Sequence, residues 1–224
     1  MPIPPPPTNW DFALEQVAPG DDLVGIGADL DVSTLYAAYS VGVFPMGIGH
    51  HGRPPIGWWS PDPRGVLRLG ALRVPRSLRK AMAHFEVRID TAFDEVVAAC
   101  ADPGREGRWI TPEVAQAYGA LHDAGWAHSV ETWHDGRLVG GLYGVAIGGL
   151  FAGESMFHTA RDASKAALVA LRDLLAADGD PRRLIDVQWR TDHLASLGVS
   201  EMSRDDYLRG LPDVLSAPLP APWA

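Results

Sequence analysis

The sequence predicts an α+β (mixed α/β) protein, with a small N-terminal domain over residues 1–62 and a larger domain around a mixed central sheet over residues 63–224. Three observations predict this class. A turn-rich stretch at 42–64 separates the two parts. Three apolar segments within 127–155 alternate like antiparallel strands, and helical segments then alternate with a further strand. A strand meander followed by alternating helices is typical of such domains.

The first half of the chain is predicted to hold three helices and one strand. Its start is a proline-rich tail, residues 2–7, and a turn-rich region precedes the first helix. Thr91 and Asp94 resemble a capping box at the start of the third helix. The expected elements are helices at 31–41, 75–84 and 91–101, and a strand at 85–90.

The second half is predicted to be a meander followed by helices around one more strand. Thr111 and Pro112 are typical of a helix start, and Gly125 of its end. The expected elements that follow are strands at 127–134, 137–146 and 150–155, a helix at 162–177, a strand at 184–188, a helix at 191–198 and a last helix opened by Ser203.

The composition is that of an ordinary globular protein, with 46% hydrophobic and 21% charged residues among 224. It contains no apolar run near the roughly 18 residues of a membrane span, and its start lacks the pattern of a signal peptide. We therefore expect a cytoplasmic protein. Cys100 is the single cysteine, so neither a disulfide framework nor a thiolate metal centre is expected.

Positive charge gathers in one segment of an otherwise acidic chain, whose formal net charge is -9. Between residues 64 and 88, Glu86 is the single acid against seven basic residues, namely Arg64, Arg68, Arg73, Arg76, Arg79, Lys80 and Arg88. Such a segment indicates either a local anion site, for example for a nucleic acid backbone, or a solvated arginine-rich face.

Three short motifs lack the rest of their patterns. Gly25-Ile26-Gly27 has no third glycine and indicates a turn rather than a dinucleotide site. Ser155 lacks the second glycine of a nucleophile elbow, although His193 and Asp192 occur later. The pair His50-His51 has no metal-site spacing and is read as a solvated loop.

Three polar residues stand in or at the end of apolar strands: Glu154, Asp186 and Gln188. Because strand side chains repeat every two residues, Asp186 and Gln188 are expected on one face, with Ile185 and Val187 on the other. A buried carboxylate and carboxamide need partners, which leaves a structural pair or a functional site as alternatives.

A set of motifs in this order resembles the bacterial leucyl/phenylalanyl-tRNA-protein transferases. The resemblance covers about residues 23–208. Its motifs are Gly42-Val43-Phe44-Pro45, Trp58-Trp59-Ser60-Pro61-Asp62-Pro63-Arg64, Trp109-Ile110-Thr111-Pro112, Gly140-Gly141-Leu142-Tyr143-Gly144-Val145, Gly153-Glu154-Ser155-Met156-Phe157, Ala163-Ser164-Lys165, Leu184-Ile185-Asp186-Val187-Gln188 and His193-Leu194-Ala195-Ser196-Leu197-Gly198.

The resemblance implies a small N-terminal domain and a GNAT-like catalytic domain that uses aminoacyl-tRNA. Such an enzyme moves Leu or Phe, and less readily Met, to a protein whose N-terminal residue is Arg or Lys, which marks that protein for degradation. Because an aminoacyl ester is already activated, the transfer needs no nucleotide, metal or other cofactor. We expect a monomer without a membrane partner.

The resemblance also implies roles for individual residues. Asp186 would serve as base or orient the amine, directly or through Gln188, and Glu154 would hold the cationic acceptor or the terminal adenosine. The aminoacyl pocket maps to Trp109, Leu142, Phe151, Leu168, Leu171 and Ile185. The adenosine and tRNA contacts map to Met46, Trp58, Trp59, Arg73, Arg76, Arg79 and Lys80. Three positions depart from the family: Leu142 replaces methionine, Leu171 replaces phenylalanine and Met46 replaces tryptophan.

Two other functions stay open at this point. Residues 137–142 faintly resemble the pyrophosphate loop of coenzyme A-dependent N-acyltransferases, but a strand continues where that loop should enter a helix. A non-catalytic module that binds basic protein N-termini or tRNA is the other alternative. Charged leucyl-tRNA and acyl-coenzyme A, each supplied with an Arg-initiated peptide, would distinguish the two transferases. Titration of the peptide without any donor would test the non-catalytic module.

Overall fold

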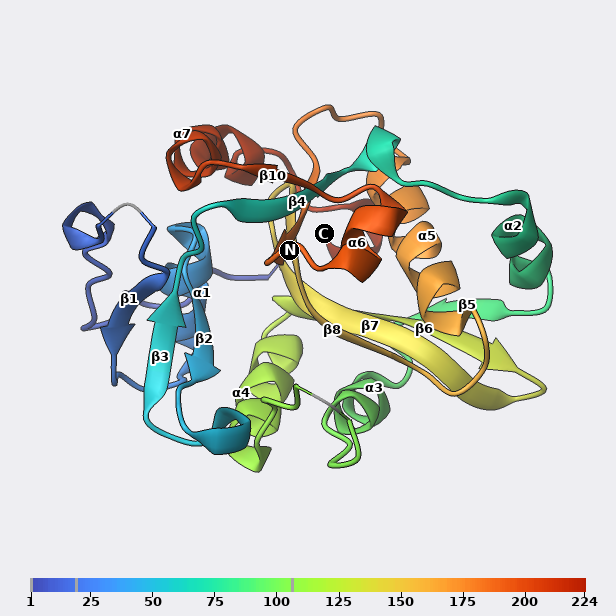
Figure 1. Cartoon of the computed structure of the whole chain (residues 1–224), viewed down its shortest axis with the longest axis horizontal. Helices are drawn as coiled ribbons and strands as arrows, with labels where there is room; N and C mark the ends of the chain where they lie inside the picture. The colour runs from blue at the N-terminus through green and yellow to red at the C-terminus, as the bar shows by residue number, and fades with distance from the viewer. Residues whose placement is uncertain (1, 19, 106) are drawn as a thin grey trace.

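The computed structural model describes residues 2–18, 20–105 and 107–224, and it has the predicted α+β class with a small N-terminal part (Figure 1). Within the described residues, the strands form one sheet of three strands and one of seven. None of the described helices is long and apolar enough to cross a membrane. The prediction of the fold class is thus confirmed.

The smaller sheet has the order β1-β3-β2 and is antiparallel. Its strands are β1 (Leu23–Ile26), β2 (Phe44–Gly47) and β3 (Ile56–Trp59), and helix α1 (Val32–Ser40) connects the first two. Sequence analysis predicted α1 but assigned the strands to turn-rich segments. Short strands interrupted by Gly and Pro carry a weak period-two signal, which explains the omission.

The larger sheet has the order β10-β4-β9-β8-β7-β6-β5. Its strands are β4 (Arg64–Arg68), β5 (Glu86–Ile89), β6 (Ala127–His134), β7 (Arg137–Ile147), β8 (Leu150–His158), β9 (Leu184–Gln188) and β10 (Ser200–Met202). The sheet is mixed because β8 and β9 run parallel, whereas β7 pairs with β8 in an antiparallel manner. The long connection that parallel neighbours need is supplied by α5 (Ala163–Ala176).

Helices cover both faces of this sheet (Figure 1). Strand β7 shows the alternation directly: Leu142 and Ala146 pack in the core with α5. Tyr143 and Val145 pack on the opposite face with α3 (Phe93–Cys100) and α4 (Pro112–Asp123). Residues of α1, β2 and β3 join that second core, so the smaller sheet shares a hydrophobic core with the larger one.

The remaining helices lie near the edges of the larger sheet. They are α2 (Arg76–Met82), α6 (Asp192–Leu197) and α7 (Arg204–Leu215), with short 3-10 turns at Leu14–Gln16, His50–Gly52, Leu69–Ala71 and Ala221–Trp223. The helix starts predicted at Thr111, Thr191 and Ser203 are confirmed, and each of these side chains is an N-cap that accepts a backbone N–H. The predicted capping box at Thr91 is wrong: its hydroxyl donates to Glu131, and Ala92 is the N-cap of α3.

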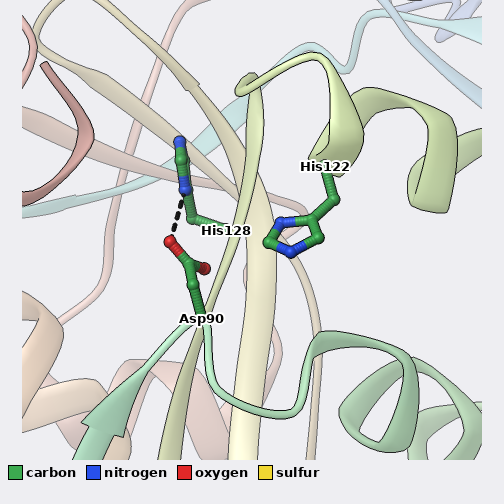
Figure 2. Close-up of side chains that lie close together, drawn as sticks. All are labelled: Asp90, His122 and His128. Atoms are coloured by element: carbon green, nitrogen blue, oxygen red, sulfur yellow. Dashed lines mark hydrogen bonds and ion pairs between the residues drawn. The ribbon is translucent and has the colours of Figure 1, made fainter.

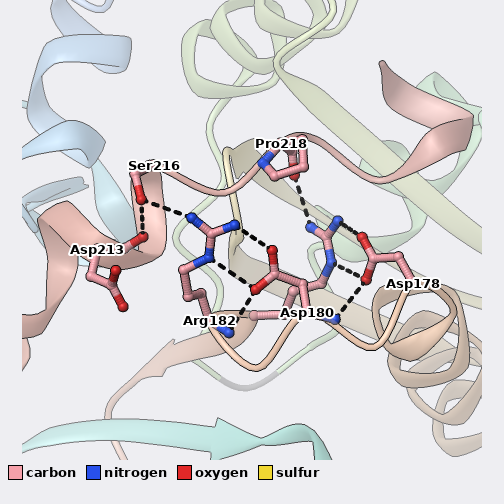
Figure 3. Close-up of polar contacts among 7 residues, drawn as sticks. Asp178, Asp180, Arg182, Asp213, Ser216 and Pro218 are labelled. Atoms are coloured by element: carbon pink, nitrogen blue, oxygen red, sulfur yellow. Dashed lines mark hydrogen bonds and ion pairs between the residues drawn. The ribbon is translucent and has the colours of Figure 1, made fainter.

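Two arginines before β9 fasten the segment that follows α7 (Figure 3). Arg182 bonds Asp180 and donates to the Ser216 hydroxyl at 3.1 Å. The next residue, Arg183, pairs with Asp178 and donates to the carbonyl of Pro218 at 3.1 Å. These bonds hold the chain on a path that brings Trp223 into the core with Phe151.

Candidate functional site

An apolar cavity of about 360 Å³ lies between the larger sheet and helices α5 and α6. Five of the six residues predicted to form an apolar pocket line it: Leu142, Phe151, Leu168, Leu171 and Ile185. They come from β7, β8, α5 and β9, so the fold brings together positions that are distant in sequence. The sixth residue, Trp109, lies in the wall of a neighbouring cavity.

This second cavity, of about 240 Å³, lies between β2 and the end of β9. Its walls include Phe44, Pro45, Met46, Trp109 and Trp189. Both cavities are lined by Glu154, Val187, Gln188, Thr191 and Leu194. A carboxyl group and a carboxamide therefore stand where the two cavities meet.

The aromatic residues of the smaller sheet take different positions. Trp58 is only 2% exposed, donates to the Gly27 carbonyl at 2.7 Å and is outside the described lining of both cavities. Trp59 donates to the Met46 carbonyl at 3.0 Å and meets Trp189 edge to face. Met46 therefore lines the second cavity, whereas Trp59 is outside its described lining and bonds the Met46 backbone.

Asp186 is fully buried and its carboxylate is fully engaged. Arg64 donates to it twice, from Nε at 2.9 Å and from Nη2 at 2.6 Å. The Tyr207 hydroxyl and the Gln188 backbone N–H also donate to it, each at 2.9 Å. Burial alone would lower the pKa of Arg64, but the charge of Asp186 outweighs that effect and raises the pKa. Asp186 thus anchors its surroundings and is outside the described lining of both cavities.

Gln188 does not share a face with Asp186, so the expected alternation is wrong at this point. Gly65 pairs with Gln188 and Val66 with Asp186, which leaves Val187 as an extra residue in a β-bulge. The φ angle of Gln188 is +60°, in the left-handed region. Gly65 permits the close approach, since a Cβ there would lie 2.9 Å from the backbone nitrogen of Arg190. The bulge therefore turns Gln188 towards the cavities.

The backbone of Gln188 is held by a hydrogen bond, whereas the donor of its side-chain carboxamide has no partner among the described residues. Its backbone N–H is fixed by Asp186, while its Nε2 is buried without a hydrogen-bond partner among the described residues. Buried donors in native proteins nearly always have a partner. Of the unpartnered buried side-chain atoms among the described residues, Gln188 Nε2 is the one whose residue lines the two cavities. Gln188 thus combines a left-handed backbone with a buried donor that has no partner among the described residues, and it does so in the walls of both cavities.

Glu154, at the other side of the junction, is half-buried and bonded to two tyrosines. Tyr39 donates to Oε1 at 2.7 Å and Tyr118 to Oε2 at 2.9 Å. Burial raises the pKa of Glu154, the tyrosine hydrogen bonds lower it in part, and the balance is a pKa of about 7. The carboxyl group is therefore close to half ionised at neutral pH.

A count of protons supports this raised pKa. The Tyr39 and Tyr118 hydroxyl oxygens are also 2.5 Å apart, so three oxygen pairs are in close contact. Burial raises the pKa of both phenols well above its usual value, so each keeps its one proton. Three hydrogen bonds need three protons. A protonated Glu154 supplies the third by donating to one tyrosine, which then donates to the other tyrosine and no longer to Glu154. Ionisation of Glu154 leaves the contact between the tyrosines without a proton.

The basic segment divides in the structure. Arg64 is buried with Asp186, and Arg88 pairs with Glu86. The four residues predicted to contact tRNA, namely Arg73, Arg76, Arg79 and Lys80, are exposed on and before α2. In Figure 1, α2 lies on the far side of α5 from the smaller sheet. Only part of the sequence's positive segment is thus available to an anion.

Sequence reasoning missed the residues that support the two polar groups. They are Arg64 and Tyr207 around Asp186, Tyr39 and Tyr118 around Glu154, and Trp189 in the second cavity. Arg64 was counted as part of a positive segment, and its place at the first position of a buried strand was the signal that it needed a counter-charge. The tyrosines carried no comparable signal.

Comparison with known proteins matches two family models to this chain. The model described as leucyl/phenylalanyl-tRNA protein transferase matches residues 66–212, and that of the N-terminal domain of the same family matches residues 28–62.

Curated relatives carry the same family name. A leucyl/phenylalanyl-tRNA--protein transferase of Thiobacillus denitrificans is 52% identical over 206 residues, covering 90% of this chain and 88% of its own. One from Nitratidesulfovibrio vulgaris is 51% identical over 204 residues, covering 88% and 85%. Among solved structures, L-PGS from Bacillus licheniformis aligns with a TM-score of 0.36 at 12% identity, covering 73% of this chain and 54% of that one.

Proposed function

Because the chain belongs to the leucyl/phenylalanyl-tRNA protein transferase family, we propose that its two adjoining cavities divide one donor substrate between them. The chain is an aminoacyltransferase whose substrates are a tRNA and a protein. The apolar cavity suits the leucyl or phenylalanyl side chain, since it is lined by Leu142, Phe151 and Leu168. The second cavity suits the terminal adenosine, whose base would lie against Met46 and Trp189.

The observation that carries this proposal is the place of Glu154 and Gln188 in the walls of both cavities. A donor that fills both cavities has its ester group at their junction. The ester is then the part of the substrate nearest to these two polar side chains. Positioning of this kind supplies much of the acceleration in reactions of activated esters.

In the proposed reaction the acceptor α-ammonium first loses one proton. Its nitrogen then attacks the ester carbonyl carbon, the new C–N bond forms and the bond to the ribose oxygen breaks. The ribose oxygen takes the second amine proton. A free α-amino group has a pKa of about 7.7 to 8.0, so about a tenth is already neutral near pH 7 and a mild base suffices.

We propose that the carboxamide of Gln188 binds both the ester carbonyl group of the donor and the attacking amine. Its unpartnered Nε2 is suited to donate to the carbonyl oxygen on which negative charge develops. Its Oε1 is suited to accept from the attacking amine. Asp186, with Arg64 and Tyr207, is a positioning residue that fixes the backbone of Gln188.

Glu154 is the group we assign to the acceptor. Its pKa of about 7 allows it to accept a proton from the α-ammonium near neutral pH, directly or through water. A carboxylate at this point also favours a cationic N-terminal residue, which supports the choice of Arg or Lys as acceptor. We propose that the chain transfers the aminoacyl group to such N-terminal residues and thereby marks the acceptor protein for degradation.

Residues outside the two cavities are assigned to tRNA binding and to the division into domains. The exposed Arg73, Arg76, Arg79 and Lys80 would bind tRNA phosphates. A division at residues 62 and 63 separates the three-stranded sheet from β4. We also propose that the chain acts as a monomer, and that it acts in the cytoplasm, where charged tRNA is found.

The test is the mass gained by an Arg-initiated peptide incubated with the chain and charged leucyl-tRNA. We expect one leucyl group per peptide, with Arg and Lys peptides modified much faster than Ala or Glu peptides, and a difference that shrinks with salt. Glu154→Gln should reduce the turnover by about 10²-fold or more. Acyl-coenzyme A in place of the charged tRNA is the control.

Equal rates for all four peptides would remove Glu154 from acceptor recognition. Near-normal turnover of Glu154→Gln, with an unchanged circular dichroism spectrum, would remove it from proton transfer.

A further inference from the structure

A cluster of two histidines and one aspartate lies apart from the two cavities (Figure 2). Asp90 follows β5, His122 is in the last turn of α4 and His128 is the second residue of β6. One ligand atom from each of the three residues lies within 4.8 Å of the other two. Figure 2 shows the His122 ring facing the hydrogen-bonded pair of Asp90 and His128.

Each of the three side chains has its second polar atom held by the backbone. His122 Nδ1 bonds the Ala127 carbonyl at 2.8 Å, and His128 Nε2 bonds the Gly125 carbonyl at 3.2 Å. Asp90 Oδ1 accepts from the Ser129 N–H at 2.8 Å. Backbone partners of this kind fix the ring orientation and tautomer of histidines in metal sites. They leave His122 Nε2, His128 Nδ1 and Asp90 Oδ2 for a common ligand.

The two imidazole rings are also held by aromatic rings. His122 stacks on Phe93 with centroids 4.1 Å apart and planes within 1°. His128 stacks on Trp223 with centroids 4.4 Å apart and planes within 12°. Side chains fixed in this way lose little conformational freedom when they bind a ligand.

We propose that Asp90, His122 and His128 bind one divalent transition-metal ion, with zinc as the best fit. Two imidazoles and one carboxylate are ligands that zinc accepts at about 2.0 to 2.2 Å. In tetrahedral geometry such ligand atoms are about 3.3 Å apart. The pair His128 Nδ1 and Asp90 Oδ2, at 2.8 Å, would open slightly around the ion, and the 4.8 Å that bounds the three atoms would shorten. The Asp90 side chain is 23% exposed, which leaves a path for the ion and a place for water as fourth ligand.

His128 Nδ1 and Asp90 Oδ2 share a hydrogen bond of 2.8 Å. A proton lies between these atoms, and the metal takes the place of that proton. Because the ligands come from the β5–α3 connection, α4 and β6, the bound ion would cross-link three elements of the larger domain. The proposal is independent of the assignments made for the two cavities.

The experiment uses the full chain, stripped with a chelator and titrated with ZnCl₂ by calorimetry. We expect one zinc ion per chain with a Kd in the micromolar range or below. Zinc at about one hundred times Kd should raise Tm by about 5 °C or more, as expected for a ligand that binds the folded state alone. Titration with CoCl₂ alone should give the intense visible absorption of a tetrahedral site.

His122→Ala should weaken zinc binding at least tenfold, so the rise in Tm at the same zinc concentration should fall to about half or less. Comparing each variant with and without zinc cancels any change in its basal stability. The matched control is the double variant His50→Ala and His51→Ala, because these adjacent exposed histidines are the most accessible competing site. The control should keep both the affinity and the rise in Tm.

Two results would overturn the proposal. One is the absence of saturable zinc binding by the wild-type chain up to about a hundred times the micromolar Kd expected above. The other is a His122→Ala variant that binds zinc as tightly as the wild type, whatever the double variant does.

Discussion

Two carboxyl groups near the cavities, those of Asp186 and Glu154, have opposite surroundings. Asp186 accepts two hydrogen bonds from Arg64 and one from Tyr207, so its carboxylate is paired with the guanidinium group. Glu154 is bonded to two neutral phenols, and its pKa is raised to about 7. Asp186 faces away from the cavities, whereas Glu154 lines both.

The difference shows that the partner of a buried carboxyl group decides its use. A carboxylate held by a bidentate arginine is rigid, which suits it to hold other groups in place. A carboxyl group bonded to phenols can exchange its proton near neutral pH, which suits it to chemistry.

Removing one member of the Arg64–Asp186 pair should affect stability most. Asp186→Ala leaves Arg64 buried without its counter-charge, and the expected loss is about 3 to 5 kcal/mol in the free energy of unfolding. Urea denaturation of the variant measures it. The role expected from the sequence, in which Asp186 acts as base or orients the amine directly or through Gln188, stays a prediction. The paired variant Arg64→Met with Asp186→Leu should recover much of the loss, and a single variant as stable as the wild type would refute the structural role.

Gln188→Ala should lower the rate of transfer strongly and the stability of the fold only slightly. Removal of a donor to the developing oxyanion typically lowers kcat by about 10²- to 10³-fold. The unfolding free energy should change by less than about 1 kcal/mol, because Nε2 has no partner among the described residues to lose. Single-turnover rates with charged leucyl-tRNA, together with urea denaturation, give both values. A variant with normal turnover would place the ester elsewhere.

Glu154 should make stability depend on pH in a direction opposite to that of a salt-bridged acid. Its folded-state pKa of about 7 lies above the ordinary value of 4.5, so the folded chain keeps a proton that the unfolded chain releases. This contribution is complete below about pH 4.5 and is lost as the pH rises through about 7. Between pH 5 and pH 8 the wild type should lose about 1 to 3 kcal/mol relative to Glu154→Gln, a range reduced for partial exposure.

Urea denaturation at the two pH values, carried out on both proteins, isolates the contribution of Glu154 from those of other groups. The turnover of the wild type should rise over the same pH range, as expected for a base that must be ionised. Parallel stability profiles for the two proteins would show that the Glu154 pKa is ordinary.

The smallest effect is expected at Met46, which shares a cavity with Glu154. An aromatic ring stacked on a base gains about 1 to 3 kcal/mol, against about 0.3 to 1.5 kcal/mol for methionine sulfur on a ring. Met46→Trp should therefore tighten the binding of an aminoacyl-adenosine analogue by about 1 kcal/mol if the larger ring fits. Trp58→Ala, in the core, should lower stability and leave affinity unchanged. Calorimetric titration of the analogue distinguishes these outcomes.

Much of the larger domain could be predicted from the sequence because its signals are local. Strands β6 to β8 alternate over long apolar runs, and Thr111 and Ser203 cap helices within three residues. The five apolar residues that line the larger cavity were found by their resemblance to the family.

The partners of the polar residues could not be predicted, since they are distant in sequence. Arg64 and Asp186 are 122 residues apart, and Tyr39 and Glu154 are 115 apart. The bulge at Val187, which turns Gln188 to the cavities, depends on pairing with β4 and has no mark in the sequence of β9. Asp90 and His128, 38 residues apart, meet through the pairing of β5 and β6.

The left-handed backbone of Gln188 limits which amino acids a mutational library can use at this position. Most residues with a Cβ are strained at φ +60°, whereas Asn and Gly adopt it more readily. Gln188→Asn keeps the carboxamide on a better-suited backbone but shortens its reach by one methylene. Gly is compatible with the backbone but has no carboxamide. Selection for activity at position 188 would therefore weigh the lower backbone strain of Asn against the longer side chain of Gln. Recovery of Gln over Asn would show that the carboxamide needs the extra methylene to reach its ligand.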